Sequence, residues 1–211
     1  MVVEQRTGRK KAVSDLKRGL ILAAAREVFE AEGLDGASLR AIAARAGYTP
    51  PALYFHFDSK EAIYAEVLLS SLAKLGEAVS RATSRGKTPA DRLRAAAMAF
   101  FRYYADNPRD LDLGFYLFRG GMKPRGLGKA RDQVLNASLA SALRPIATAA
   151  EALGARRDEA NVLMVETFAH AAGLLLLAHT GRMRMFAASA PQLMERYIAG
   201  KIAALTAGRD S

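Results

Sequence analysis

The chain has 211 residues, of which 51% are hydrophobic and 25% are charged. This composition supplies enough apolar material for a folded core and excludes a disordered or collagen-like chain. Cysteine is absent, which excludes disulfides, thiol nucleophiles and thiolate metal sites. The formal net charge is +10, and this excess favours a polyanionic partner without showing where that partner binds.

The positive charge is spread unevenly along the chain. Most of the excess lies in residues 67–211, but the first 18 residues are also basic. In those 18 residues Arg6, Arg9, Lys10, Lys11, Lys17 and Arg18 stand against Glu4 and Asp15. This local run predicts a basic N-terminal arm.

No targeting or membrane-spanning segment is expected. The basic N-terminus is not followed by the apolar run of a signal peptide. The most apolar stretch, Thr167 to Gly181, is shorter than the roughly 20 residues that a bilayer span needs. A cytoplasmic protein without a membrane partner is therefore the simplest expectation.

Hydrophobic positions repeat at helical spacing along the whole chain, and no segment is typical of a β-strand. Apolar residues between Leu16 and Phe29 predict a first helix with one buried face, and Gly33 supplies its stop signal. N-cap residues, prolines and periodicity predict the later helices. They cover residues 60–85, 89–107, 110–118, 129–153, 159–180 and 190–206. An all-α protein is therefore expected.

Two short helices are predicted between the first helix and the next long one. Ser38 is a candidate N-cap for a helix over residues 39–45, and Gly47 lies where a tight turn needs a left-handed backbone. A second helix follows over residues 50–57, with two prolines in its first turn. This is the organisation of a helix-turn-helix, whose second helix fits the major groove of B-DNA. The same spacing also suits an ordinary helix pair in an α-bundle.

The segment from Ile21 to Leu68 resembles the DNA-binding domain of the TetR family of bacterial transcriptional regulators. The resemblance runs through AAREVFEAEG, SLRAIAARAG and ALYFHFDSKEAI, with the family's intervals between them. Several anchored positions at fixed spacing make it far more specific than a lone short motif. The chain departs from the family at residues 49–52, where the family often has Ser or Lys and Gly. This departure lies in the variable part that reads the DNA sequence.

The resemblance implies that this segment binds double-stranded DNA, and it gives individual positions contact roles. Ser38 lies at a helix N-terminus, where its hydroxyl and the free amides can hold a phosphate. Thr49 can meet a base edge or the backbone, and the prolines after it can contact thymine methyl groups. The expected DNA-binding residues are Ser38, Arg40, Thr49, Pro50, Pro51, Tyr54, His56 and Lys60.

Ordinary structural roles stay open for several of these residues. Tyr54 could be half-buried packing, and His56 could form a hydrogen bond at a helix end. Arg40 and Lys60 could be merely solvated. Two neighbouring aromatic side chains are expected in the core: Phe55 and Phe57.

The resemblance also implies that the later helices form a ligand-binding and dimerisation domain. The helix predicted over residues 159–180 is apolar nearly all round in its second half, and a helix of this kind must be covered on all sides. Together with the last helix it could form half of a four-helix dimer interface, or simply the core of a monomer. A two-fold dimer presents two recognition helices about 34 Å apart, one turn of DNA.

A pocket for a small-molecule effector is expected among the aromatic and Met side chains of the middle helices. An ordinary core is the alternative for each of them. The candidate pocket residues are Phe100, Tyr103, Tyr104, Tyr116, Met164, Phe168 and His170. Residues 119–131 hold five cations and no carboxylate before residue 132, so this loop could attract an anionic effector or DNA, or be a solvated basic loop.

No catalytic residue, metal site or cofactor is predicted, because the three histidines have no nucleophile or metal-ligand spacing beside them. We therefore expect an all-α, non-enzymatic protein with a basic arm over residues 1–18. The arm is followed by a three-helix helix-turn-helix domain over residues 19–66. A larger helical effector-binding and dimerisation domain covers residues 67–211.

The expected function is that of a ligand-responsive transcriptional regulator, with a repressor favoured. It would bind a near-palindromic operator as a homodimer, and a small molecule in the C-terminal domain would release it. One alternative is a helical ligand-binding or enzymatic domain without sequence-specific DNA binding. Another is a non-specific DNA-coating protein driven by the positive charge.

Overall fold

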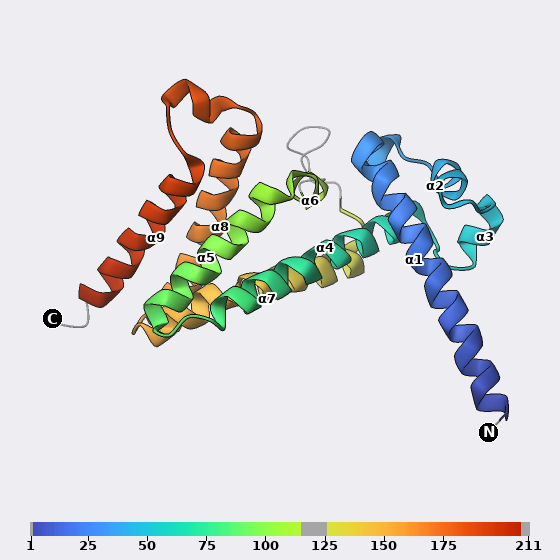
Figure 1. Cartoon of the computed structure of the whole chain (residues 1–211), viewed down its shortest axis with the longest axis horizontal. Coiled ribbons are helices and arrows are strands. Elements are labelled where there is room, and N and C mark those ends of the chain that lie inside the picture. Colours follow the sequence, from blue (N-terminus) through green and yellow to red (C-terminus); the bar gives the residue numbers. More distant parts are fainter. Residues whose placement is uncertain (1, 115–125, 208–211) are drawn as a thin grey trace. The chain divides into compact units, whose positions relative to one another are not determined.

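The computed structural model describes residues 2–114 and 126–207, and it describes side chains from Ala12 onward. Within these ranges every regular element is a helix (Figure 1), which confirms the all-α prediction. The elements are α1 (Val2–Gly36), α2 (Leu39–Ala46), α3 (Pro50–Tyr54), α4 (Lys60–Thr83), α5 (Pro89–Asp106), α6 (Pro108–Gly114), α7 (Lys129–Ala152), α8 (Arg157–His179), the 3-10 helix η2 (Arg182–Phe186) and α9 (Ala190–Ala207).

The chain forms two compact units. The first consists of Met1–Ser70 with Asp112–Leu135, and the second of Ser71–Leu111 with Asn136–Ser211. Helices α4, α6 and α7 each contribute residues to both units. The predicted division between residues 66 and 67 stays a prediction.

The first unit has a small core in which α1 packs against α2 and α2 packs against α3. Phe29 of α1 meets Tyr64 of α4 edge to face, with ring centroids 4.7 Å apart. The Tyr64 hydroxyl donates a buried hydrogen bond of 2.8 Å to the carbonyl oxygen of Leu113. The other fully buried side chains of this core are Ile21, Ala25, Ile42, Ala43, Leu53 and Ile63.

Local stop and start signals work as the sequence predicts. Gly33 interrupts α1 with a φ of 69°, and Gly47 ends α2 with a φ of 73°. Both angles lie in the left-handed region, where a side chain would be strained. The Ser38 hydroxyl accepts a hydrogen bond of 3.1 Å from the Ala41 amide and so caps α2.

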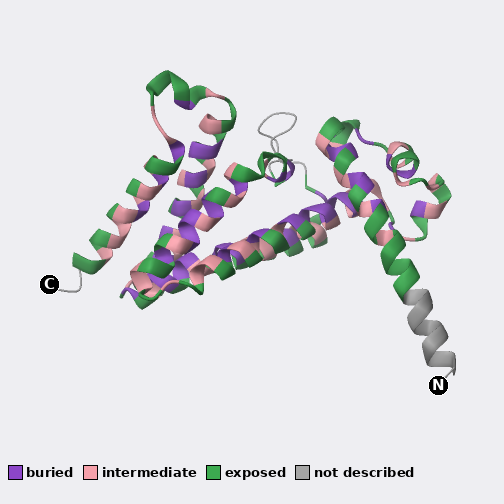
Figure 2. Ribbon diagram, viewed as in Figure 1, coloured by how far each residue is buried: buried purple, intermediate pink, exposed green. Residues whose placement is uncertain are grey.

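The second unit is built around α5, α8 and α9, which pack against one another. Thr88 and Asp91 form a reciprocal capping box at the start of α5. Purple segments in Figure 2 mark the buried positions along these helices. The largest fully buried side chains of this unit are Leu75, Leu93, Phe100, Phe101, Ile146 and Leu175.

The structure corrects two local predictions. Helix α3 ends at Tyr54, whereas the sequence predicts a helix to residue 57. The amides of His56 and Phe57 both donate to the Leu53 carbonyl oxygen, each at 2.9 Å. The chain therefore turns after Tyr54, which buries Phe57 but leaves Phe55 89% exposed. The prediction of a core position is confirmed for Phe57 and is wrong for Phe55.

Helix α8 is the one described helix with the length and mean hydropathy, 1.6, of a membrane span. This is weak evidence, because the core helix of a folded domain passes the same test. Helix α8 packs against α5 on one side and α9 on another. The 3-10 helix that follows it was not predicted from the sequence.

Candidate nucleic-acid interface

Helices α2 and α3 form a fixed pair joined by a tight turn. Ile42 and Ala43 of α2 are buried on the side facing α1, and Leu53 anchors α3 in the same core. The turn is closed by the Tyr48 amide, which donates a hydrogen bond of 2.9 Å to the Ala43 carbonyl oxygen. The opposite sides of both helices therefore face solvent, as a DNA-reading helix-turn-helix requires.

The structure brings the eight predicted DNA-contact residues onto this one unit, on α2, on α3 and at the start of α4. Five of them are exposed: Ser38, Arg40, Thr49, Pro51 and Tyr54. The other three are partly exposed: Pro50, His56 and Lys60. Because Tyr54 is exposed, its ring is not half-buried in the core, which was the structural alternative to a DNA contact.

Two hydroxyl groups at helix starts differ in what they do. Ser38 caps α2 through its oxygen, and its hydroxyl proton stays available as a donor. Thr49 occupies the corresponding position before α3, but its side chain makes no capping hydrogen bond. Both hydroxyl groups can therefore donate to a DNA phosphate or base edge.

Lys60 is held in place rather than merely solvated. Its ammonium group donates a hydrogen bond of 3.0 Å to the carbonyl oxygen of Ala37, the residue before the α2 cap. Ser59 caps the same end of α4 by accepting from the Ala62 amide at 3.1 Å. An ammonium group has three protons, so Lys60 can hold the α1–α2 turn and still donate to a phosphate.

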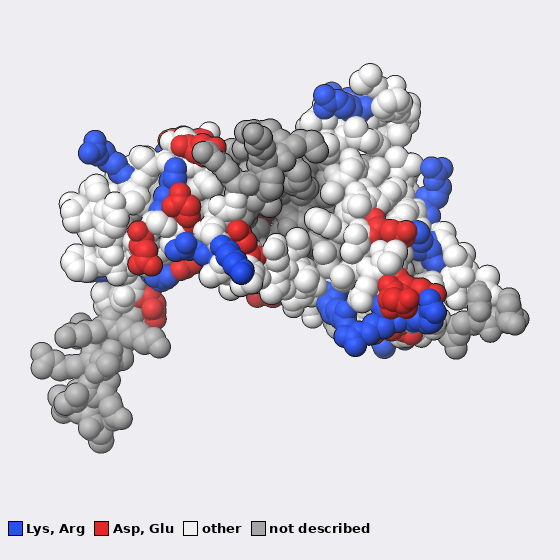
Figure 3. Space-filling model, turned by 180° about the vertical axis from the view of Figure 1, so that it is seen from behind, with Lys and Arg blue, Asp and Glu red and all other residues white. Residues whose placement is uncertain are grey.

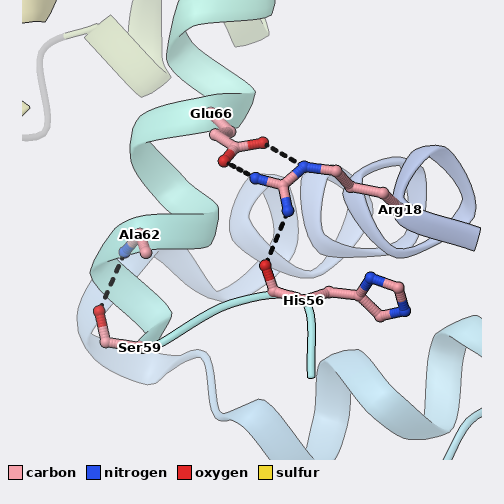
Figure 4. A network of polar contacts seen from close by, with 5 residues as sticks. All are labelled: Arg18, His56, Ser59, Ala62 and Glu66. Atoms are coloured by element: carbon pink, nitrogen blue, oxygen red, sulfur yellow. Dashed lines mark hydrogen bonds and ion pairs between the residues drawn. The ribbon is translucent and has the colours of Figure 1, made fainter. Parts of the chain in front are cut away.

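Arg18 of α1 holds the segment between α3 and α4 in place (Figure 4). Its guanidinium pairs with both carboxylate oxygens of Glu66 on α4, with Nε 3.1 Å from Oε2. Its Nη1 donates to the His56 carbonyl oxygen at 2.7 Å, and the group lies 4.3 Å from the centre of the Phe57 ring. This one side chain therefore fixes the segment after α3 against both α1 and α4.

Sequence reasoning missed this role, because it placed Arg18 in a basic arm. Arg18 and Glu66 are 48 residues apart, and no helical spacing relates positions so distant. The one signal in the sequence is an arginine and a glutamate on the polar sides of two predicted helices, which is too common to indicate a pair.

Figure 3 shows basic and acidic side chains interspersed over the face that it presents. In the first unit Arg45 and Glu27 form an exposed ion pair, with 3.1 Å between Nη1 and Oε2. The net charge of +10 is thus not gathered into one continuous basic patch on the described part of this face. Non-specific coating of DNA would be favoured by such a patch.

We expect Ser38→Ala to lower the free energy of unfolding by about 1 kcal/mol, because α2 loses its N-cap. Ser38→Asp should keep the cap, since a carboxylate accepts the same amide hydrogen bond. It should nevertheless weaken DNA binding, because it places a negative charge where a phosphate is expected. Urea unfolding followed by circular dichroism and DNA titration measure the two effects separately.

These two variants test the cap and the phosphate contact independently. If Ser38→Asp bound DNA as tightly as the wild type, no phosphate would lie at this helix start. If Ser38→Ala were as stable as the wild type, the hydrogen bond to Ala41 would contribute nothing measurable.

The candidate pocket residues divide into two places in the second unit. Phe100 lies edge to face with Tyr104 and with Phe168, with ring centroids 5.3 and 5.8 Å apart. Tyr103 continues this aromatic cluster, 5.3 Å from Tyr104, and Met164 packs against the same core. Burial raises the pKa of Tyr104, so its hydroxyl stays neutral.

The Tyr103 hydroxyl joins this cluster to two other helices. It donates to Asp110 Oδ2 at 2.6 Å and lies 3.2 Å from the Ser71 carbonyl oxygen. Asp110 is itself 3% exposed. The hydroxyl thus joins α4, α5 and α6 within the second unit.

His170 lies apart from the aromatic cluster and faces α9. Its ring stacks on Tyr197 at a centroid distance of 4.1 Å, and burial lowers the pKa of His170. An open groove of about 520 Å³ runs beside it, lined also by Leu193, Arg196, Gly200 and Lys201. His170 therefore belongs to the α8–α9 surface and not to the aromatic cluster.

Two parts of the pocket hypothesis lie outside the described residues. These are Tyr116 and the stretch of the basic loop that contains Arg119, Lys123 and Arg125. Within residues 2–114 and 126–207, no group of three His, Asp or Glu side chains could hold a metal ion.

Comparison with known proteins places these features in one family. The model of the DNA-binding domain described as "Bacterial regulatory proteins, tetR family" matches residues 21–67, the range that contains α2 and α3. A stretch of 89 residues is 42% identical to the HTH-type transcriptional activator FasR of Mycolicibacterium smegmatis. That match covers 42% of this chain and 41% of the length of FasR.

Two further similarities extend beyond the helix-turn-helix. The HTH-type transcriptional repressor NicS of Pseudomonas putida is 28% identical over 156 residues, which cover 74% of this chain and 73% of NicS. The crystal structure of the transcriptional regulator FadR from Bacillus subtilis, solved in complex with stearoyl-CoA, superposes with a TM-score of 0.66 at 17% identity. It covers 90% of this chain and 97% of that chain, so the fold is shared along nearly the whole length. Residues 21–67 are thus a DNA-binding domain of the TetR family of bacterial transcriptional regulators.

Proposed function

We propose that the chain is a ligand-responsive transcriptional regulator that binds a near-palindromic operator as a homodimer. The observation that carries the proposal is the α2–turn–α3 pair, whose inner side is buried and whose outer side presents hydroxyl, amide and cationic groups. These are the donors that phosphates and base edges accept. FasR and NicS are both named as transcriptional regulators, one an activator and one a repressor.

Within this proposal, contacts divide into those that position the protein and those that read the sequence. Ser38, Tyr54, His56 and Lys60 would hold phosphates on either side of the major groove. Arg40, Thr49 and the two prolines of α3 would meet base edges, where apolar contact with thymine methyls is available to the prolines. The Arg18–Glu66 pair would keep the His56 segment in register with α4.

The α8–α9 surface supports the homodimer. Val162, Val165 and Leu176 of α8 are large apolar side chains that the described chain leaves exposed. Two grooves of about 520 and 290 Å³ lie on the same two helices, and Val162 lines the smaller one. A second copy that packs the same surface against this one would bury these side chains by a two-fold, self-complementary contact.

The effector is proposed to bind within the helices of the second unit. The aromatic cluster of Phe100, Tyr103, Tyr104 and Phe168 offers an apolar lining, and the Tyr103–Asp110 pair offers one polar anchor. The bound stearoyl-CoA of FadR makes a long-chain acyl thioester the first class of molecule to test. An effector releases DNA only through different affinities for two arrangements, and a tenfold loss requires about 1.4 kcal/mol.

A repressor is the favoured form, because release by a small molecule needs only a change in the separation of two reading heads. The competing function, a helical ligand-binding or enzymatic domain without sequence-specific DNA binding, would not need the exposed donors of α2 and α3. The FasR and NicS names also favour regulation over enzymatic activity.

Selection of bound duplexes from a random pool tests the proposal directly. The full chain should enrich an inverted repeat at about 150 mM salt, with half-sites one helical turn or a multiple of it apart. Binding that ignores sequence and disappears as salt rises would instead show coating of DNA by charge. Absence of any binding with and without acyl thioester would favour the domain without a DNA-reading role.

A further inference from the structure

The 3-10 helix η2 carries two large apolar side chains that the described chain leaves exposed. Met185 is 78% exposed and Phe186 is 70% exposed, and we call this pair the η2 tip. The helix is anchored beneath the tip, because Met183 is buried and its carbonyl oxygen accepts a hydrogen bond of 3.3 Å from the Ala188 amide. Ala187 ends the turn with a φ of 47°, a left-handed angle that residues other than glycine seldom adopt. A defined and strained turn therefore holds the tip outward.

A groove of about 290 Å³ lies at the opposite end of the same two helices. It runs between the first turns of α8 and the last turns of α9, whereas η2 joins the other ends of these helices (Figure 1). We call it the end groove. Apolar side chains and carboxylates line it together: Val162, Leu163, Leu205, Asp158, Glu159 and Glu166. This lining suits an apolar group that has cations beside it.

The two ends of the α8–α9 hairpin differ in charge. Arg182 and Arg184 are exposed on η2, and no carboxylate occurs in residues 167–194. Each carboxylate of the end groove has a cationic partner in its own chain, at 2.5 to 3.2 Å. The Asp158 and Glu159 side chains nevertheless stay 71% and 52% exposed, and a carboxylate accepts hydrogen bonds from several donors. The end groove can therefore take up two further arginines.

The exposed side of α8 indicates how a second copy would lie on it. Small and apolar residues follow one another there at spacings of three and four: Val162, Val165, Ala169, Gly173 and Leu176. This stripe is its own reverse about Ala169. An antiparallel copy would thus set Val162 beside the partner's Leu176, and Val165 beside the open space around the partner's Gly173. A parallel copy would set the two η2 helices together, where their four arginines would repel one another.

We propose that η2 of each protomer docks into the end groove of a second copy. The η2 tip would pack on the apolar lining, with Arg182 and Arg184 beside the carboxylates. The inference rests on the proposed homodimer and adds two reciprocal contacts that close it at both ends. In the antiparallel arrangement η2 follows the last turn of one α8, so it comes beside the first turn of the partner's α8. The end groove is incomplete without the partner's η2.

A lipid surface is the other partner that an apolar and basic tip would suit. Helices that lie in a membrane surface often run to about 20–30 residues, whereas η2 has five. A lipid surface would also leave the end groove empty. A second copy accounts for the exposed tip and for the groove with one contact.

The absence of cysteine from the sequence allows a direct test with single thiols. Phe186→Cys is co-expressed with Ala204→Cys, since Ala204 is an exposed small residue that lines the end groove. A short bis-maleimide then joins thiols that lie close together, without the narrow geometry that a disulfide requires. The control co-expresses Phe186→Cys with Val134→Cys, which places an exposed thiol in the first unit. Denaturing electrophoresis measures the covalent dimer.

The Phe186→Cys and Ala204→Cys pair should give several times more covalent dimer than the control pair or either variant alone. Sedimentation equilibrium supplies a second readout. Met185→Ser combined with Phe186→Ser should raise the dissociation constant of the dimer about tenfold, which corresponds to about 1.4 kcal/mol. Phe55→Ser also removes an exposed ring, but from the first unit, and it should leave the dimer unchanged.

Three outcomes would overturn the proposal. Efficient cross-linking of Phe186→Cys to itself would place the two η2 helices together. A wild-type dimer whose Phe186→Cys and Ala204→Cys pair cross-links no better than the control would show that η2 does not enter the end groove. Binding of the wild type to phosphatidylglycerol vesicles that the double serine variant loses, with an unchanged dimer, would assign the η2 tip to a membrane surface.

Failure of the proposed homodimer gives a different result. The wild type would then sediment as a monomer, which would overturn the homodimer and the docking of η2 together. A wild type that sediments as a dimer without the expected cross-link would overturn only the docking of η2.

Discussion

A Phe29→Ala variant is expected to lose about 3–5 kcal/mol of unfolding free energy in the helix-turn-helix unit. Phe29 is fully buried, and its ring meets Tyr64 at 4.7 Å, so α1 and α4 are joined through it. Alanine leaves a cavity between these helices, and the surrounding core can close it only in part. Since the unit holds α2 and α3 in place, DNA binding should fall with its stability.

Urea unfolding followed by circular dichroism measures the change, and the chain supplies a matched control. Phe55 is an equally large aromatic side chain in the same unit, but it is 89% exposed. Phe55→Ala should therefore alter stability by no more than about 0.5 kcal/mol. Equal destabilisation by the two variants would contradict either the burial of Phe29 or the exposure of Phe55.

A Val165→Lys variant is expected to raise the dissociation constant of the homodimer at least 100-fold. Val165 lies on the exposed side of α8 and is 60% exposed in the single chain. In the proposed dimer its replacement would bury an unpaired ammonium group, at a cost of several kcal/mol. A 100-fold change corresponds to about 2.7 kcal/mol. Sedimentation equilibrium measures it.

Val134→Lys is the control for this prediction. Val134 lies on the part of α7 that belongs to the first unit and is 53% exposed, so the same charge enters an equally open position that is not part of α8 or α9. It should leave both the dimer and operator binding unchanged. If both lysine variants dimerised like the wild type, another surface would form the dimer and the role given to α8 and α9 would be wrong.

Local chemistry explains why much of the fold could be predicted from the sequence. The Ser38 cap, the left-handed Gly47 and the Thr88–Asp91 capping box are each decided by residues within a few positions of one another. Signals of this range are visible in a sequence and are strong enough to survive packing. They also set the spacing of α2 and α3, and hence the position of the candidate interface.

Features that depend on distant residues could not be predicted in this way. The Arg18–Glu66 pair joins positions 48 residues apart, and the exposure of Phe55 follows from a turn that ends α3 at Tyr54. The stacking of the His170 ring on Tyr197 joins two different helices of the second unit. Tertiary packing decides all three, and a pattern along one helix carries no information about it.

Reading of base sequence by α3 can be examined by changing one exposed residue of this helix. The measurement is selection from a random duplex pool by the wild type, by Pro51→Gln and by Tyr54→Phe. Pro51 is exposed in the first turn of α3, and glutamine there can bond an adenine edge, which is worth about 1–3 kcal/mol of discrimination.

We expect Pro51→Gln to enrich an inverted repeat that is changed at one or two base pairs in each half-site. Tyr54→Phe should enrich the wild-type repeat with lower affinity, because it removes only a phosphate contact. An identical repeat from the wild type and from Pro51→Gln would mean that α3 does not read the bases.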